Sequence, residues 1–225
     1  MADHMQDEAD LEALKRWWDE NGKGLVAAVV VAVLGTVGWQ QYQGFTVSRT
    51  EAASDLYAAM LANHLGDGDP DALASLATEL RDDHASSTYA RFGAMLEARI
   101  AVDAGDMTGA EAALRWALTA GDTGSDIGQL IQLRLARVLA DQGNETEALA
   151  ILAKGSSAYP VAYAQAEGDI HLAAGRPEAA LAAYRQGRDL ASDLGQYSVV
   201  LDNKVRTLET RLPPSSEDAP AEDAS

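Results

Sequence analysis

The chain has 225 residues, and its 35 Asp and Glu against 17 Lys and Arg give a formal net charge of −18. A surface this acidic repels polyanions, which excludes nucleic acid as a partner and disfavours anionic lipid headgroups. The sequence contains no cysteine, which excludes disulfides, thiol catalysis and Cys-ligated zinc.

The first 23 residues predict a short stub that holds an amphipathic helix at the membrane interface. Leu11, Leu14 and Trp18 fall at helical spacing beside Lys15 and Arg16. The side chains expected at the interface itself are Trp17, Trp18 and Lys23. The dipeptide Asn-Gly at positions 21–22 is a common turn signal, so we expect the helix to break there.

The next stretch, residues 24–45, reads GLVAAVVVAVLGTVGWQQYQGF and predicts a transmembrane helix. No charged residue occurs between Lys23 and Arg49. At ~1.5 Å per residue the stretch spans ~33 Å, which exceeds the ~30 Å hydrocarbon core. Its aromatic and amide side chains near the end suit the headgroup level. The residues that mark the predicted anchor are Leu25, Val29, Val33, Val37, Trp39 and Tyr42.

Two alternatives to a membrane anchor are a buried core helix and a cleaved signal peptide. The first requires a polar face, which the stretch lacks. The second requires a short basic leader and a small-residue cleavage site. Here the segment before the apolar stretch is 23 residues long and rich in acids, and no A-x-A follows the stretch. Lys15, Arg16 and Lys23 precede the span, and only Arg49 follows within the next 30 residues. This bias predicts a cytoplasmic N-terminus, with the bulk of the chain across the membrane.

The run LEALKRWWDENGK, residues 11–23, directly before an apolar span that ends in Gly38-Trp39, resembles the start of the YfgM family. The resemblance implies an ancillary subunit of the SecYEG translocon, with one bacterial inner-membrane span and a periplasmic tetratricopeptide-like domain. It also implies contact with the membrane-anchored periplasmic chaperone PpiD and with unfolded or newly translocated proteins. Beyond Phe45 the likeness is one of helical pattern, without a further motif.

Residues 46–212 predict an all-α domain. Alanine is abundant, no stretch alternates as a strand would, and breakers recur at helix-length intervals. Apolar stripes predict successive helices around residues 57–65, 73–80, 89–100, 110–118, 127–139, 148–152, 163–170, 181–188 and 194–208. The predicted fold is a single N-terminal transmembrane helix followed by a tetratricopeptide-like α-solenoid of three to four helical hairpins.

Two turns repeat within this domain. Gly143 and Gly175 lie 32 residues apart, and each is followed five residues later by an alanine, Ala148 and Ala180. This spacing is close to the ~34-residue tetratricopeptide period, in which glycine ends one helix and small residues let the next approach closely. A third turn at Gly105 is similar, although its leucine comes three residues late.

The remaining sequence offers little chemistry. Residues 213–225, PPSSEDAPAEDAS, predict a disordered acidic tail. The four histidines do not share a helix face, and the alternating aspartates at 67, 69 and 71 are similar to a calcium loop but lack its twelfth-position glutamate. Neither a Walker sequence nor G-x-S-x-G occurs, so we expect no catalytic residue, cofactor or metal, and a protein that is not an enzyme.

The sequence therefore predicts a membrane-anchored protein-interaction domain, because stacked helical hairpins form binding surfaces. Tyr163, Tyr184 and Tyr197 are candidates to line a groove, although such aromatics commonly pack between repeats. The alternatives are an envelope scaffold for cell-division or peptidoglycan machinery, a membrane-bound enzyme with an unrecognised site, and a stub that serves as a regulator's ligand.

Overall fold

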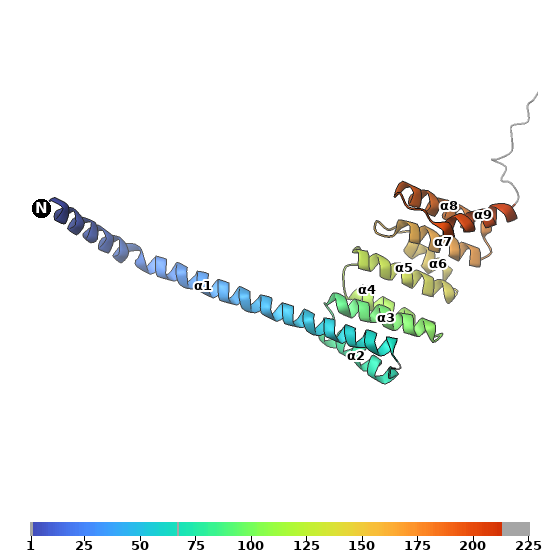
Figure 1. Cartoon of the computed structure of the whole chain (residues 1–225), viewed down its shortest axis with the longest axis horizontal. Coiled ribbons are helices and arrows are strands. Elements are labelled where there is room, and N and C mark those ends of the chain that lie inside the picture. Colours follow the sequence, from blue (N-terminus) through green and yellow to red (C-terminus); the bar gives the residue numbers. More distant parts are fainter. Residues whose placement is uncertain (1, 67, 213–225) are drawn as a thin grey trace, which may run out of the picture. The chain divides into compact units, whose positions relative to one another are not determined.

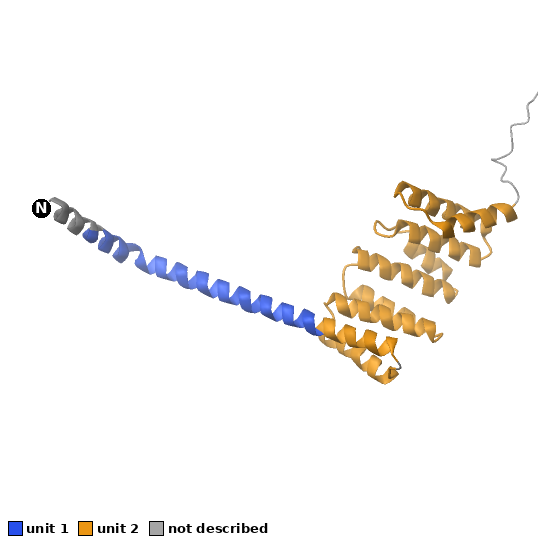
Figure 2. Ribbon diagram, in the orientation of Figure 1, with its two compact units in different colours: residues 1–52 blue, residues 53–225 orange. Residues whose placement is uncertain are grey.

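The computed structural model describes residues 2–66 and 68–212, with the side chains of residues 2–10 and 13 outside that description. The predicted tail at 213–225 also lies outside the described residues. Two compact units divide the chain, residues 1–52 and residues 53–225 (Figure 2). The described residues form nine α-helices and no strand, which confirms the all-α prediction.

The helices follow one another with short connections, as Figure 1 shows. Their bounds are α1 Ala2–Leu65, α2 Pro70–Asp83, α3 Thr88–Asp103, α4 Met107–Thr119, α5 Asp126–Asp141, α6 Glu145–Leu152, α7 Pro160–Ala173, α8 Pro177–Asp193 and α9 Val199–Arg211. Several begin with a side-chain cap. Asp69, from the calcium-like stretch, accepts the backbone N–H of Asp71 over 3.0 Å and so caps α2 directly before Pro70.

The break expected at residues 21–22 is absent, because α1 continues through them. The Asn21 side chain donates to the carbonyl of Trp17, one turn earlier, over 3.1 Å. Gly22 is buried beneath the indole of Trp18, whose ring atoms would lie 3.1 Å from an added Cβ. Asn-Gly therefore stays helical here, since the amide bonds back along the helix and the missing side chain makes room for a ring.

Residues 53–65 of α1 and the eight later helices form the second unit. Within it α3 packs on α4, α5 on α6 and α7 on α8, while α9 closes the end against α8. Three clusters of buried side chains run through this stack. The first joins α1, α2 and α3 around Met60 and Leu80, the central one spans α3 to α7, and the last joins α8 and α9 around Tyr184 and Leu201.

The predicted long stripe from residue 194 to residue 208 is wrong in its first part. Helix α8 ends at Asp193, and Gly195 adopts a positive φ of 67°. Ser198 then caps α9 by accepting the backbone N–H of Leu201 over 3.3 Å. The buried stripe consequently begins only at Leu201, because the glycine and the serine together turn the chain.

Candidate functional site

The second unit carries an open groove of about 870 Å³, formed where α1, α3 and α5 lie beside one another. Its apolar floor contains Tyr57, Tyr89, Phe92, Met95, Leu96 and Leu130. Its charged side chains are Arg99, Asp103, Arg134, Arg137 and Asp141. The lining residues of α3 and of α5 recur at helical spacing, so each of these helices presents one face to the groove.

Three rings form the aromatic part of the floor. The ring centroids of Tyr57 lie 6.1 Å from Tyr89 and 5.9 Å from Phe92. Tyr89 and Phe92 meet edge to face, with centroids 6.3 Å apart. All three side chains are half-buried. Such a cluster offers apolar contact area that is already ordered, so binding of a ligand side chain there would cost the protein little conformational entropy.

The charged side chains of the groove differ in their pairing. Arg99 Nε donates to Asp103 Oδ2 over 2.8 Å, one turn along α3. Arg134 and Arg137 are exposed and make no ion pair with any residue that the structure describes. Asp141, one turn beyond Arg137, is the remaining acid. Within this groove, therefore, three arginines face two aspartates.

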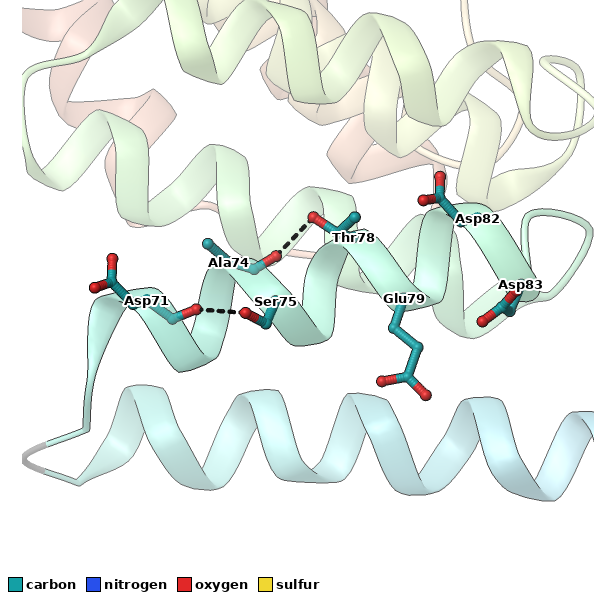
Figure 3. Close-up of a pocket in the computed structure, with 7 residues that line it drawn as sticks. All are labelled: Asp71, Ala74, Ser75, Thr78, Glu79, Asp82 and Asp83. Carbon is teal, nitrogen blue, oxygen red and sulfur yellow. Dashed lines mark hydrogen bonds between the residues drawn. The ribbon is translucent and has the colours of Figure 1, made fainter.

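A second hollow lies along α2 and has the opposite character, as Figure 3 shows. Its charged residues are all acids: Asp71, Glu79, Asp82 and Asp83. The hydroxyls of Ser75 and Thr78 donate to carbonyls of their own helix, both over 2.9 Å. This hollow has no apolar floor of the groove's kind, so we interpret it as a solvated acidic face.

A buried arginine fixes the packing of α3 beside the groove. Arg91 Nε donates to the Ala117 carbonyl over 3.2 Å, and its guanidinium also reaches the Asp122 carbonyl over 3.3 Å. Arg91 thereby binds the C-terminal end of α4, where the helix dipole favours a cation. Burial lowers the pKa of Arg91, and the negative charge of Asp122 opposes that shift.

A second contact that holds α3 is an ion pair with α2. Arg81 pairs with Glu97 and also lies over the Trp116 ring, 5.3 Å from its centroid. Burial raises the pKa of Glu97, and the charge and hydrogen bond of Arg81 oppose the rise. Together with Arg91 this contact holds α3 between its neighbours, which positions Tyr89, Phe92 and Leu96 toward the groove.

The predicted turn residues lie at equivalent places in the stack. Gly105, Gly143 and Gly175 have φ values of 79°, 84° and 71°. Each glycine lies in the same Schellman pattern of hydrogen bonds. For example, the Asn144 N–H donates to the Leu139 carbonyl over 2.8 Å. The alanines five residues later, Ala110, Ala148 and Ala180, are fully buried. The turn at Gly105, whose leucine comes three residues late in the sequence, therefore has the same geometry and also keeps its alanine.

The predicted anchor residues all lie on α1. Among the described residues, one helix is long enough and apolar enough to cross a membrane. It is the part of α1 that runs over Leu14–Leu65. The valines and leucines of residues 24–45 are exposed on every side, and only 6% of the most apolar window is buried, which disfavours a core helix. The Thr36 hydroxyl, in the middle of the apolar stretch, donates to the Ala32 carbonyl over 2.6 Å, so it needs no water. The predicted anchor residues on this helix are Leu25, Val29, Val33, Val37, Trp39 and Tyr42. The predicted interfacial residues that precede them are Trp17, Trp18 and Lys23.

The tyrosines singled out from the sequence lie away from the groove. Tyr163 and Tyr184 are buried, and their hydroxyls donate to the Gln129 carbonyl over 2.8 Å and to Asp169 over 2.6 Å. Tyr197 is exposed in the connection between α8 and α9. The aromatic residues that the groove uses, Tyr57, Tyr89 and Phe92, were visible in the sequence only as members of two separate apolar stripes.

The described residues hold no cluster of three or more His, Asp and Glu side chains that could bind a metal ion. The histidines at 64, 84 and 171 lie on different helices or turns. Nor does the groove contain a nucleophile beside a base. Its chemistry is that of a surface for apolar and charged contact.

Comparison with known proteins gives one family. The family described as a tetratricopeptide repeat-like domain matches residues 15–210. The ancillary SecYEG translocon subunit of Aggregatibacter actinomycetemcomitans is 32% identical over 200 residues, which cover 88% of this chain and 97% of that protein. The protein of the same name from Haemophilus influenzae is 30% identical over 87% of this chain and 95% of its own length.

A more distant protein of that name, from Escherichia coli K12, is 28% identical over 79% of this chain and 84% of its own length. No solved structure matches the chain significantly. A helical repeat fold and relatives named as accessory subunits both point to a non-catalytic protein.

Proposed function

Because this chain belongs to the tetratricopeptide repeat-like family of ancillary SecYEG translocon subunits, the YfgM family, we propose that it is itself an accessory subunit of the translocon. The observation that carries the proposal is the extent of the likeness. The match to the Aggregatibacter actinomycetemcomitans subunit covers 97% of that protein. The family match begins at residue 15, so the apolar span and the repeats both fall inside it.

In this proposal α1 holds the protein in the bacterial inner membrane as a single-pass anchor. The basic residues Lys15, Arg16 and Lys23 before the span favour a cytoplasmic N-terminus. The repeat unit would then lie in the periplasm, where a fold without cysteine is stable without disulfides. Anchoring raises the effective concentration of the groove near the exit of the translocon.

We further propose that the groove receives segments of newly translocated proteins and assists their handover to periplasmic chaperones. The groove's size, its aromatic floor and its exposed arginines support this role. The membrane-anchored chaperone PpiD, a partner implied by the sequence resemblance, is the proposed recipient. The protein would act by binding alone, without catalysis.

Co-purification tests the first part. Full-length chain with a C-terminal affinity tag is extracted from its own bacterium in a mild detergent that keeps the translocon intact. We expect SecY, SecE and SecG to be recovered with it. Failure to recover any of them, while the translocon stays assembled in the same extract, would contradict the proposed function.

Crosslinking tests the second part. A photo-crosslinking amino acid at position 92 in the groove is expected to capture exported proteins and PpiD during secretion. The matched control places it at position 197, an exposed aromatic outside the groove. Equal capture at both positions would show that the groove has no special part in handover.

A further inference from the structure

The charge balance of the groove is opposite to that of the acidic chain as a whole. The chain as a whole carries −18, and the α2 hollow holds four acids without a base. In the groove Arg99 is neutralised by Asp103, which leaves Arg134 and Arg137 against Asp141. The net charge of the groove side chains is therefore +1, since three arginines face two aspartates.

The two arginines stand on one face of α5. Positions 134, 137, 138 and 141 are spaced for one side of a helix, so both guanidiniums accompany Val138 along the groove. Neither makes an ion pair with a described residue, and each keeps its full set of N–H donors available. Arginine forms bidentate bonds with carboxylates, which gives such an opening a defined preference.

The apolar floor lies in the same groove as these donors. Tyr57 and Tyr89 contribute half-buried rings, and no described residue bonds to their hydroxyls. A ligand that satisfies both halves of the groove needs an apolar side chain for the rings and a carboxylate for the arginines. A purely apolar segment would leave the guanidiniums unpaired, and a basic one would meet like charge.

We propose that the groove selects acidic amphipathic segments of other polypeptides, with an aromatic or aliphatic side chain on the Tyr57–Tyr89–Phe92 cluster and a carboxylate on Arg134 or Arg137. This proposal rests on the groove acting as the binding site in the proposed function, and it adds the class of ligand. The net negative charge of the chain disfavours an acidic segment elsewhere on the surface, whereas the exposed arginines of the groove attract it.

Peptide binding to the full-length chain in detergent micelles tests the proposal. The probes are three short fluorescent peptides with the same phenylalanine and leucine positions and with glutamate, glutamine or lysine at the others. Fluorescence anisotropy gives each dissociation constant. We expect the glutamate peptide to bind about ten-fold more tightly than the glutamine peptide, the range for a charge-assisted hydrogen bond. This preference should decrease as ionic strength rises.

Variants separate the two halves of the site. The double variant Arg134→Gln with Arg137→Gln should abolish the preference, so that the glutamate peptide binds no more tightly than the glutamine peptide. The control Lys154→Gln with Arg206→Gln removes the same charge from exposed positions outside the groove and should preserve the preference. Phe92→Ala should weaken binding of both peptides. Because Arg134 and Arg137 are exposed, an unchanged Tm will verify that their variants are folded.

Three results would overturn the inference: equal binding of the glutamate and glutamine peptides, tightest binding of the lysine peptide, or no binding of any peptide. The proposed function is judged separately, since co-purification with the translocon does not depend on peptide charge. A chain that recovers the translocon but binds acidic and amide peptides equally would keep its proposed function and lose the proposed selectivity.

Discussion

Tyr184 and Tyr197 allow a direct measurement of what burial adds to a hydrogen bond in this fold. The Tyr184 hydroxyl donates to Asp169 Oδ1 over 2.6 Å, and the side chain is fully buried. The Tyr197 hydroxyl donates to Asp202 Oδ2 over the same 2.6 Å, but that side chain is 76% exposed. Replacing either tyrosine by phenylalanine removes only the hydroxyl, so the two variants compare burial at equal bond length.

We expect Tyr184→Phe to lower the free energy of unfolding by about 1–2 kcal/mol. The acceptor is a carboxylate, which strengthens the bond, but Asp169 is partly exposed and retains Lys204, whose Nζ donates to it over 2.6 Å. Tyr197→Phe should change stability by less than ~0.5 kcal/mol, because water replaces an exposed partner readily. For a unit of this size about 1 kcal/mol corresponds to ~2–4 °C, so Tyr184→Phe should lower Tm by roughly 2–8 °C.

Thermal unfolding of the full-length chain in mild detergent, followed by far-ultraviolet circular dichroism, measures both values. The pH dependence provides a second test. Burial, and secondly the bond to Asp169 and its charge, raise the pKa of Tyr184 above its ordinary value. A raised folded-state pKa stabilises the protein below the unfolded value of ~10 and loses that effect as pH rises further. The difference between wild type and Tyr184→Phe should therefore shrink above about pH 10. Equal Tm values for Tyr184→Phe and Tyr197→Phe at neutral pH would refute the reasoning.

Two further predictions concern the turns and the topology. Gly143→Ala should lower Tm by about 2–4 °C. Alanine at a φ of 84° costs ~1–2 kcal/mol in the folded state, and the lower conformational entropy of the unfolded variant offsets only part of that cost. The control Gly124→Ala should be neutral, because the φ of that glycine lies outside the positive range. Single cysteines in this cysteine-free chain should report its orientation: a membrane-impermeant maleimide should label Ser192→Cys in intact spheroplasts and Asp19→Cys only after lysis, and the reverse pattern would contradict the proposed topology.

The repeat stack was predictable because its signals are local. A glycine that must adopt a positive φ and an alanine that must be buried are both set within six residues, so Gly143 with Ala148 and Gly175 with Ala180 could be read directly. The same holds for the helix that starts at Pro70, where aspartate and proline mark the first turn. Such positions depend on backbone geometry and on packing between helices that are adjacent in the sequence, so their requirements can be inferred from a short stretch.

Two local signals were misleading because residues within one turn of them outweigh them. Asn21 and Gly22 form a common turn pair, but in the structure each interacts with a tryptophan one turn earlier and the helix continues. Residues 194 and 197 fit a helical stripe, yet Gly195 and Ser198 between and beside them end one helix and begin the next. In both places the combined effect of two neighbouring residues decided the backbone.

The groove could not be predicted, because its parts come from helices far apart in the sequence. Tyr57 and Phe92 are 35 positions apart, and Arg134 lies a further 42 positions along the chain. Each residue alone has an ordinary place on a helix face. Only the packing of α3, fixed by Arg91 and by the Arg81–Glu97 pair, brings rings and guanidiniums to one surface. If the groove binds its ligand as proposed, loss of the Arg91 contacts should weaken binding without touching any groove side chain, since Arg91 orders the helix that carries the floor.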